Sequence, residues 1–308
     1  MDKLRQGYAY AIITVLIWST VAAAFKVSLR YVDFLQLLFY ASIVSSSFFF
    51  VVLLIQNKLI LLKTYSRKDY LHSVLLGFLN PFLYYVVLFK AYSLLPAQEA
   101  QTLNYTWPIM IAFLSIPILK QKIQFKSVLA IIISFAGVLI TSTQGDILRF
   151  SFTNLTGASL ALSSAMIWAL FWIYNIRDKR DEVAKLFLNF TFGFTFILIS
   201  SLLFSKIIIL DVIGLLGVVY VGLFEMGITF MIWLKALKTS KTTAQVSHLI
   251  YVVPFLSMIT IHFIVGERIL FSTILGLIFV VSGIALQQLV VTREGFLHRK
   301  AHDKMHTY

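Results

Sequence analysis

The segment Leu103-Asn-Tyr-Thr-Trp-Pro108 is repeated, with changes, as Leu249-Ile-Tyr-Val-Val-Pro254. The match continues downstream at the same spacing, where Ser134-Phe-Ala-Gly137 corresponds to Val280-Val-Ser-Gly283. Upstream, Leu16-Ile-Trp18 is followed in the second half of the chain by Met166-Ile-Trp168. A chain whose halves match in this way is built from two structural repeats, and this repetition decides the predicted fold.

The composition is that of a membrane protein. Of the 308 residues, 59% are hydrophobic and 13% are charged, with a mean hydropathy of +0.89, whereas a soluble domain carries about 25% charged residues. Ten apolar runs have close to the ~20 residues that a bilayer-spanning helix needs, and their connections are too short for a soluble domain. The runs cover about residues 7–28, 34–55, 70–92, 97–119, 126–143, 155–175, 185–205, 211–235, 242–265 and 269–291.

Basic residues predict the orientation of these helices. If both ends of the chain are cytoplasmic, the cytoplasmic segments hold all but six of the 26 Lys and Arg residues, as the positive-inside rule requires. The six at predicted outer ends are Lys26, Arg30, Lys90, Arg149, Lys206 and Arg268. The net charge of +13 therefore reflects topology, and no nucleic-acid partner is predicted.

Each repeat contains five predicted helices. Because five is odd, the second repeat must insert upside down relative to the first, and inverted repeats are typical of transporters with a site near the membrane midplane. The predicted fold is therefore an all-α integral membrane protein with ten transmembrane helices in two inverted five-helix repeats. The predicted parts are a cytoplasmic N-terminus (1–6), the first repeat (7–143), an outer loop (144–154), the second repeat (155–291) and a basic cytoplasmic tail (292–308).

Several function classes find no support in the sequence. There is no cysteine, which excludes disulfides and thiolate metal sites. The chain contains no His-Glu-x-x-His and no Gly-x-Ser-x-Gly motif, and an intramembrane hydrolase needs a nucleophile with a base, or a metal. We therefore predict no catalytic residues, no metal and no cofactor. The sequence leaves the oligomeric state open.

Three stretches resemble the EamA-type branch of the drug/metabolite transporter superfamily. They are Leu16-Ile-Trp18-Ser-Thr20, Glu99-x4-Asn104-Tyr105-x-Trp107-Pro108 and Ile167-Trp168-Ala169, and the Gly266-Glu267-Arg268 turn fits the same pattern. The second motif is similar to that of the aromatic amino-acid exporters in this branch. The resemblance implies ten helices around a central cavity, cytoplasmic termini and export of small metabolites. Glu225, and Lys120-Gln-Lys122 at the first-repeat turn, depart from the pattern.

The run 97–119 carries most of the candidate site. Glu99 lies within this apolar run, where a charge costs roughly 3 kcal/mol at the helix centre and less near the interface. Pro108 cannot donate to the carbonyl of Asn104, and a kink there frees that carbonyl. We expect Glu99, Asn104, Tyr105 and Trp107 to contact substrate, with core packing around a kink as the alternative. Glu99, Asn104 and Trp107 do not recur in the second repeat, and an asymmetric substrate needs asymmetric contacts.

Further candidates lie at predicted membrane depth in other runs. Glu225 is near the middle of the run 211–235, the costliest depth for a carboxylate, so reversible protonation is one interpretation and a structural hydrogen bond is the other. Glu99 and His248 are the other proton-coupling candidates. Gly137 and Gly283 are expected at close helix contacts. The remaining predicted substrate contacts are Trp18, Asn80, Tyr84, Trp168 and Tyr251.

These features predict a secondary transporter in the cell membrane. We expect it to export a small metabolite, such as an amino acid or an aromatic cation, by alternating access, with protons as the candidate coupling ion and the lipid bilayer as its solvent. A nucleotide-sugar or lipid-head-group carrier is the alternative. That function requires cations in the cavity, and only Lys26, Lys90 and Lys235 come near, all close to helix ends. An intramembrane enzyme or a receptor is the third class.

Overall fold

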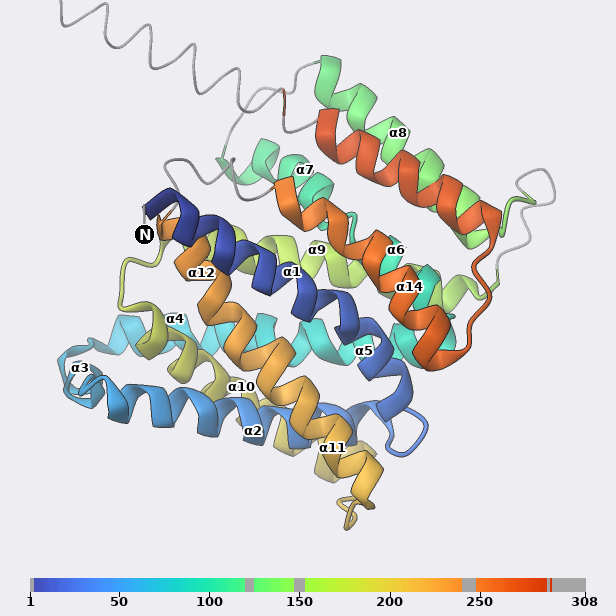
Figure 1. Cartoon of the computed structure of the whole chain (residues 1–308). Coiled ribbons are helices and arrows are strands. Elements are labelled where there is room, and N and C mark those ends of the chain that lie inside the picture. The colour runs from blue at the N-terminus through green and yellow to red at the C-terminus, as the bar shows by residue number, and fades with distance from the viewer. Residues whose placement is uncertain (1–2, 120–124, 147–152, 240–247, 287–288, 290–308) are drawn as a thin grey trace, which may run out of the picture.

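The computed structural model describes residues 3–119, 125–146, 153–239, 248–286 and 289, and every regular element within them is helical (Figure 1). This confirms the predicted all-α fold. The elements are α1 (Lys3–Ser28), α2 (Phe34–Ile55), α3 (Leu59–Thr64), α4 (Arg67–Gly77), η1 (Phe78–Leu83), α5 (Tyr84–Leu94), α6 (Ala97–Asn104), α7 (Trp107–Leu119), α8 (Phe125–Ser142), α9 (Leu155–Arg177), α10 (Glu182–Phe204), α11 (Val212–Tyr220), η3 (Val221–Ile228), α12 (Thr229–Thr239), η4 (His248–Val252), α14 (Val253–Val265) and a last helix, Phe271–Leu286.

Within the described residues, six helical stretches are long and apolar enough to cross a bilayer. They are Gln6–Ser28, Phe34–Ile55, Arg67–Leu94, Leu155–Asn175, Glu182–Phe204 and Val212–Trp233. The other four predicted runs also contain helix, but in shorter or interrupted form. The run 97–119 is not one spanning helix, because it divides into α6 and α7, and the start of the run 242–265 lies outside the described residues.

Prolines account for the interruptions in equivalent places of the two repeats. The backbone turns at Tyr105 and Thr106 between α6 and α7, just before Pro108. In the second repeat, the 3₁₀ segment η4 ends at Val252 and α14 starts with Pro254 in its first turn. A proline has no N–H to donate and fits the first turn of a helix, so an α-helix begins beside each of these prolines. In the first repeat the predicted kink separates α6 from α7, whereas in the second repeat η4 passes directly into α14.

Two irregular helical segments also occupy equivalent places. η1 is a kink between α4 and α5 that contains Asn80 and Pro81, with Asn80 outside the helical region of backbone angles, whereas η3 is a π segment that contains Glu225. Counted from the matched pair Lys90 and Lys235, Asn80 is the first-repeat counterpart of Glu225. A π segment leaves backbone groups out of the regular ladder and frequently lies at a functional site.

The last helices of the two repeats show the pseudo-two-fold relation directly. α8 and Phe271–Leu286 lie side by side in opposite directions (Figure 1). A Cβ on Gly137 would come within 2.5 Å of the Gly276 carbonyl oxygen, and a Cβ on Gly283 within 2.6 Å of the Ala130 carbonyl oxygen. These two contacts exchange under the repeat offset of 146 residues, and Ser134 bonds to its own counterpart, the carbonyl of Val280. The glycines therefore serve close packing, as predicted.

The first helices of the repeats also run in opposite directions. The last turn of α1 lies beside Leu95, because Lys26 Nζ donates to the Leu95 carbonyl oxygen at 2.5 Å. The first turn of α9 lies beside the same residue, since a Cβ on Gly157 would come within 2.7 Å of Leu95 Cγ. One helix ends where its counterpart begins (Figure 1), which confirms the inverted repeat. We call this end of the bundle the predicted outer face and the opposite end the predicted cytoplasmic face.

Candidate functional site

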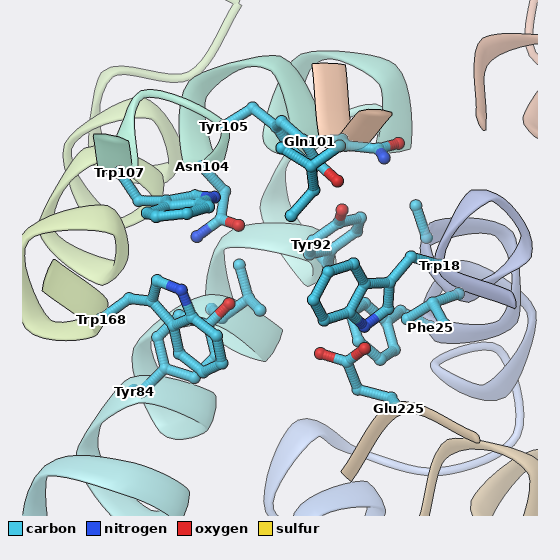
Figure 2. Close-up of a pocket in the computed structure, with 14 residues that line it drawn as sticks. Trp18, Phe25, Tyr84, Tyr92, Gln101, Asn104, Tyr105, Trp107, Trp168 and Glu225 are labelled. Carbon is cyan, nitrogen blue, oxygen red and sulfur yellow. The ribbon is translucent and has the colours of Figure 1, made fainter. Parts of the chain in front are cut away.

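A central cavity lies between the two repeats, bounded by α1, α5, α6, α7, α9, η3 and η4 (Figure 2). It has a volume of about 60 Å³, smaller than the 300 Å³ or more typical of a small-molecule site. The cavity is therefore contracted relative to a typical substrate site and has room for only a few water molecules. Its lining residues are Trp18, Val21, Ala22, Phe25, Tyr84, Leu88, Tyr92, Gln101, Asn104, Tyr105, Trp107, Trp168, Glu225 and Ile250.

Aromatic residues make up half of the lining residues of the cavity. Tyr84 and Trp168 face each other with ring centroids 4.5 Å apart, and Phe25 meets Tyr92 edge-on at 5.2 Å. On the opposite side, Trp18 packs against Trp233 at 5.7 Å. Aromatic pairs at these distances hold one another in fixed orientations, so the wall is a packed surface that presents ring faces and edges to an occupant.

Glu225 is the single carboxylate among the described lining residues. Its side chain points into the cavity beside Trp18, across from Tyr84 and Trp168 (Figure 2). Tyr85 donates its hydroxyl to Glu225 Oε1 at 3.1 Å, and the Trp18 ring lies beside the carboxylate (Figure 2). The residue is 7% exposed. The π segment η3 thus presents a buried carboxylate with one hydroxyl donor and one side open to the cavity.

Two amide side chains on α6 supply the other polar contacts. Asn104 donates from Nδ2 to Ser164 Oγ on α9 at 2.9 Å, which leaves its Oδ1 as an acceptor beside the cavity. Gln101, one turn earlier, donates from Nε2 to Ser257 Oγ on α14 at 2.7 Å. Both amides are therefore anchored to a helix of the second repeat, and α6 ties the two repeats together at the cavity.

The structure brings together seven of the residues that the sequence singled out: Trp18, Tyr84, Asn104, Tyr105, Trp107, Trp168 and Glu225. Three others do not line the cavity. Glu99 is buried on another side of α6 and bonds to Thr153, Asn80 is fully buried in η1, and Tyr251 packs behind the cavity wall in a cluster with Val15 and Trp233. The side chain of His248 lies outside the described residues.

Sequence reasoning missed Phe25, Tyr92 and Gln101. A periodic signal was present, because Trp18, Ala22 and Phe25 follow helical spacing, as do Tyr84, Leu88 and Tyr92. Residues at these spacings share one face of a helix. The missed residues lie one or two turns away from a predicted contact residue, on the same face of the same helix.

A group of hydrogen bonds joins helices of the two repeats at the predicted outer face. Lys26 Nζ donates to the carbonyl oxygens of Tyr92 and Leu95 at 2.8 and 2.5 Å. Glu267 accepts from the backbone N–H groups of Ala97 and Gln98 at 2.7 and 3.2 Å, where a carboxylate compensates the start of α6. We call Lys26, Glu267 and the backbone of residues 92–98 the outer latch. The Gly266-Glu267-Arg268 turn thus has a structural role that connects the second repeat to the first.

The geometry is that of a chamber between two inverted repeats, and comparison with known proteins assigns its family. The model of the EamA-like transporter family matches residues 5–143 and again residues 155–287. The chain belongs to the EamA-like transporter family. It is therefore a multi-pass membrane protein of a transporter family. Among the described residues no group of three His, Asp or Glu side chains is placed to hold a metal ion.

Known relatives of the EamA-like chain agree with this assignment. An uncharacterized transporter of Clostridium kluyveri is 30% identical over 54% of this chain, a match that spans 55% of the relative's own length. The uncharacterized transporter YyaM of Bacillus subtilis is 26% identical and covers 72% of this chain and 74% of its own. An uncharacterized transporter of Archaeoglobus fulgidus is 22% identical over 89% of this chain and 94% of its own.

The fold also occurs among solved structures. One crystal structure superposes with a TM-score of 0.64 and covers 94% of this chain and 99% of its own, at 19% sequence identity. This likeness concerns the fold alone.

Proposed function

We propose that this transporter exports small metabolites that join an amine or other cationic group to an aromatic or apolar body, such as aromatic amino acids or aromatic cations. The observation that carries the proposal is the buried Glu225 carboxylate inside an aromatic chamber at the repeat interface. The resemblance of the Glu99–Pro108 motif to aromatic amino-acid exporters supports the aromatic part of the substrate and the outward direction.

The chemistry of the wall favours a positive group on the substrate. A cation over an aromatic face gains about 0.5–1 kcal/mol at exposed sites and about 2 or more when water is excluded. Glu225 adds a charge partner at the same place, and no Lys, Arg or His is among the described lining residues. For an amino acid, the second N–H of each amide, on Gln101 Nε2 and Asn104 Nδ2, is the available donor to its carboxylate.

Proton coupling follows from the depth of Glu225. An ionised carboxylate within the membrane costs several kcal/mol unless it is paired, so Glu225 stays charged with a cationic substrate and takes up a proton when the substrate leaves. Exchange of one cation for the other at one carboxylate couples the two fluxes. Glu99 is the other carboxylate that this scheme must test, and we assign coupling to Glu225 because it alone faces the cavity.

Alternating access fits the contracted cavity and the outer latch. With the predicted outer face held by Lys26 and Glu267, release on that side requires those hydrogen bonds to break. The two repeats then rock about the cavity. We place the protein in the cell membrane with both ends cytoplasmic, as the distribution of basic residues predicts.

A nucleotide-sugar or lipid-head-group carrier fits the cavity less well. Such substrates carry phosphate, which calls for Lys or Arg in the chamber. Lys26 is directed at backbone carbonyl groups of the latch, Lys90 lies over the ring of Phe34 at 5.1 Å, and Lys235 is exposed. None of them lines the cavity.

The test is transport in proteoliposomes with an imposed pH gradient, using tyramine as a probe cation and tyrosine as a probe amino acid. Glu225→Gln is expected to abolish the dependence of flux on the pH gradient. Glu99→Gln tests the second carboxylate, and Glu182→Gln at the start of α10 is the control for loss of one carboxylate far from the cavity. Retained coupling in Glu225→Gln refutes the assignment, and flux of neither probe refutes the substrate class.

A further inference from the structure

A second hollow lies at the predicted cytoplasmic face, away from the transport cavity. It opens between the first turns of α4 and the end of α9 with the loop that follows. Four permanent cations and two carboxylates line it together with one histidine: Lys68, Asp69, His72, Arg177, Asp178, Lys179 and Arg180. Its residues come from both repeats, since α4 belongs to the first and α9 to the second.

The two carboxylates of this hollow already have partners. Arg180 holds Asp178 through Nε and Nη2, with the shortest contact at 2.6 Å, and both side chains are buried. Asp69 accepts hydrogen bonds from the backbone and hydroxyl of Ser66 and so caps α4. Arg180 also donates from Nη1 to the Asp69 carbonyl oxygen at 2.9 Å, which fixes the loop against α4. These groups form the rigid floor of the hollow.

The remaining cations have no anion to neutralise them. Within the part of the chain that the structure describes, Lys68, Arg177 and Lys179 form no ion pair, and all three are exposed. Holding three positive groups around one hollow is electrostatically unfavourable unless an anion joins them. A phosphate group supplies oxygens for several Lys and Arg donors at once.

The surface next to the hollow indicates which kind of molecule fits there. Lys68 on α4 is followed at helical spacing by Leu71 and Leu75 on the same helix and by Phe78 at the start of η1, which are 68%, 48% and 36% exposed. This apolar strip extends from the hollow into the membrane. A cationic group at the interface above a strip of exposed apolar side chains matches a lipid, with its head group above and its acyl chains below.

We propose that this hollow binds the phosphate of an anionic phospholipid head group through Lys68, Arg177 and Lys179. The bound lipid joins the cytoplasmic end of α4 to the α9–α10 loop, and its chains lie along Leu71 and Leu75. It therefore stabilises the contact between the two repeats at this face, independently of the substrate in the central cavity.

Thermal stability in detergent tests the proposal, because a ligand that binds only the folded state raises Tm. The purified full chain is titrated with phosphatidylglycerol, phosphatidylcholine or inorganic phosphate at constant ionic strength, and native mass spectrometry counts the retained lipid. Phosphatidylglycerol is expected to raise Tm more than the other two. Lys68→Gln/Arg177→Gln/Lys179→Gln is expected to weaken its binding roughly hundredfold, since each cation near an anionic surface contributes about 1 kcal/mol, or about fivefold.

The control is Lys63→Gln/Lys126→Gln/Lys235→Gln, which removes the same charge from exposed positions outside the hollow. Unchanged lipid binding in the test variant, or equal loss in both variants, overturns the proposal because it shows a diffuse charge effect. Stabilisation by inorganic phosphate alone overturns the lipid as occupant. If the test variant is not monodisperse on size exclusion, the three single variants replace it, each with an expected loss of about fivefold.

Discussion

The outer latch gives the sharpest prediction about the transport cycle. Lys26→Met keeps a long apolar side chain but removes two hydrogen bonds from an ammonium group to the carbonyl oxygens of Tyr92 and Leu95. A hydrogen bond to a charged group contributes about 1.5–3 kcal/mol. Because Lys26 is half-buried and the freed carbonyls regain water, we take the lower figure for the pair. The closed-to-open equilibrium at the outer face then shifts about tenfold toward open.

Thiol labelling measures this shift directly, because the chain contains no cysteine. Ala22 lines the cavity and is 2% exposed, so Ala22→Cys provides a single buried reporter. A membrane-impermeant maleimide applied to intact cells is expected to react about ten times faster in the Lys26→Met background. Glu267→Gln, which retains one acceptor oxygen, is expected to give a smaller increase.

The control for the latch is Lys90→Met, which removes a lysine of the same face that rests on Phe34 and takes no part in the latch. An equal labelling rate in Lys26→Met and the parent, or an equal increase in Lys90→Met, would refute the assignment of the latch. Size-exclusion profiles and Tm values of all variants establish that a change in labelling does not come from unfolding.

Two further predictions concern stability. Gly276→Ala is expected to lower the free energy of unfolding by about 1–3 kcal/mol, and with it Tm, because the added Cβ would lie 2.7 Å from the Gly137 carbonyl oxygen. Ile278→Ala, on the exposed side of the same helix, is the control and is expected to change Tm little. Burial raises the pKa of Asp178, but hydrogen bonds from Arg180 outweigh it and hold that pKa below its usual value. Because the pKa of Asp178 is lower in the folded state than in the unfolded state, its ionised carboxylate stabilises the fold above the unfolded pKa of about 4, and this stabilisation is lost as pH falls below that value. The Tm difference between wild type and Asp178→Asn should therefore shrink in melts below pH 4. A gap of constant size between pH 3 and 7 would contradict this account.

Much of the fold was predictable because the bilayer limits the choices. A spanning helix needs a set length of apolar residues, and basic residues mark one side, so composition and charge predicted the helical runs. The match between Leu103–Pro108 and Leu249–Pro254 then predicted two repeats of opposite direction, which the contact between Gly137 and Gly276 confirms. Helix continuity was less predictable, because the sequence indicated a kink at Pro108 where the chain ends one helix and begins another.

The sequence predicted how deep in the membrane the cavity lies, but not which side of each helix faces it. Sequence position places Glu99, Gln101 and Asn104 within about 8 Å along one helix axis, yet only the last two line the cavity. Successive residues of a helix turn by about 100°, and which side of α6 faces the chamber depends on how α1, α8 and α9 pack around it. Polarity therefore singled out Glu99, whereas packing selected Gln101.

The sequence by itself determined that this chain is a membrane protein of two inverted helical repeats. Spanning a bilayer requires apolar runs of set length, and a repeated half leaves matching segments at a constant offset, and both features can be read directly from the sequence. Only the tertiary structure decided which side chains meet. Glu225 and Tyr85 lie far apart in sequence and share a hydrogen bond, and Lys26 and Glu267 bind the backbone of residues 92–98 from different repeats. Such contacts depend on the rotation and tilt of each helix, which the combined packing of all the helices sets.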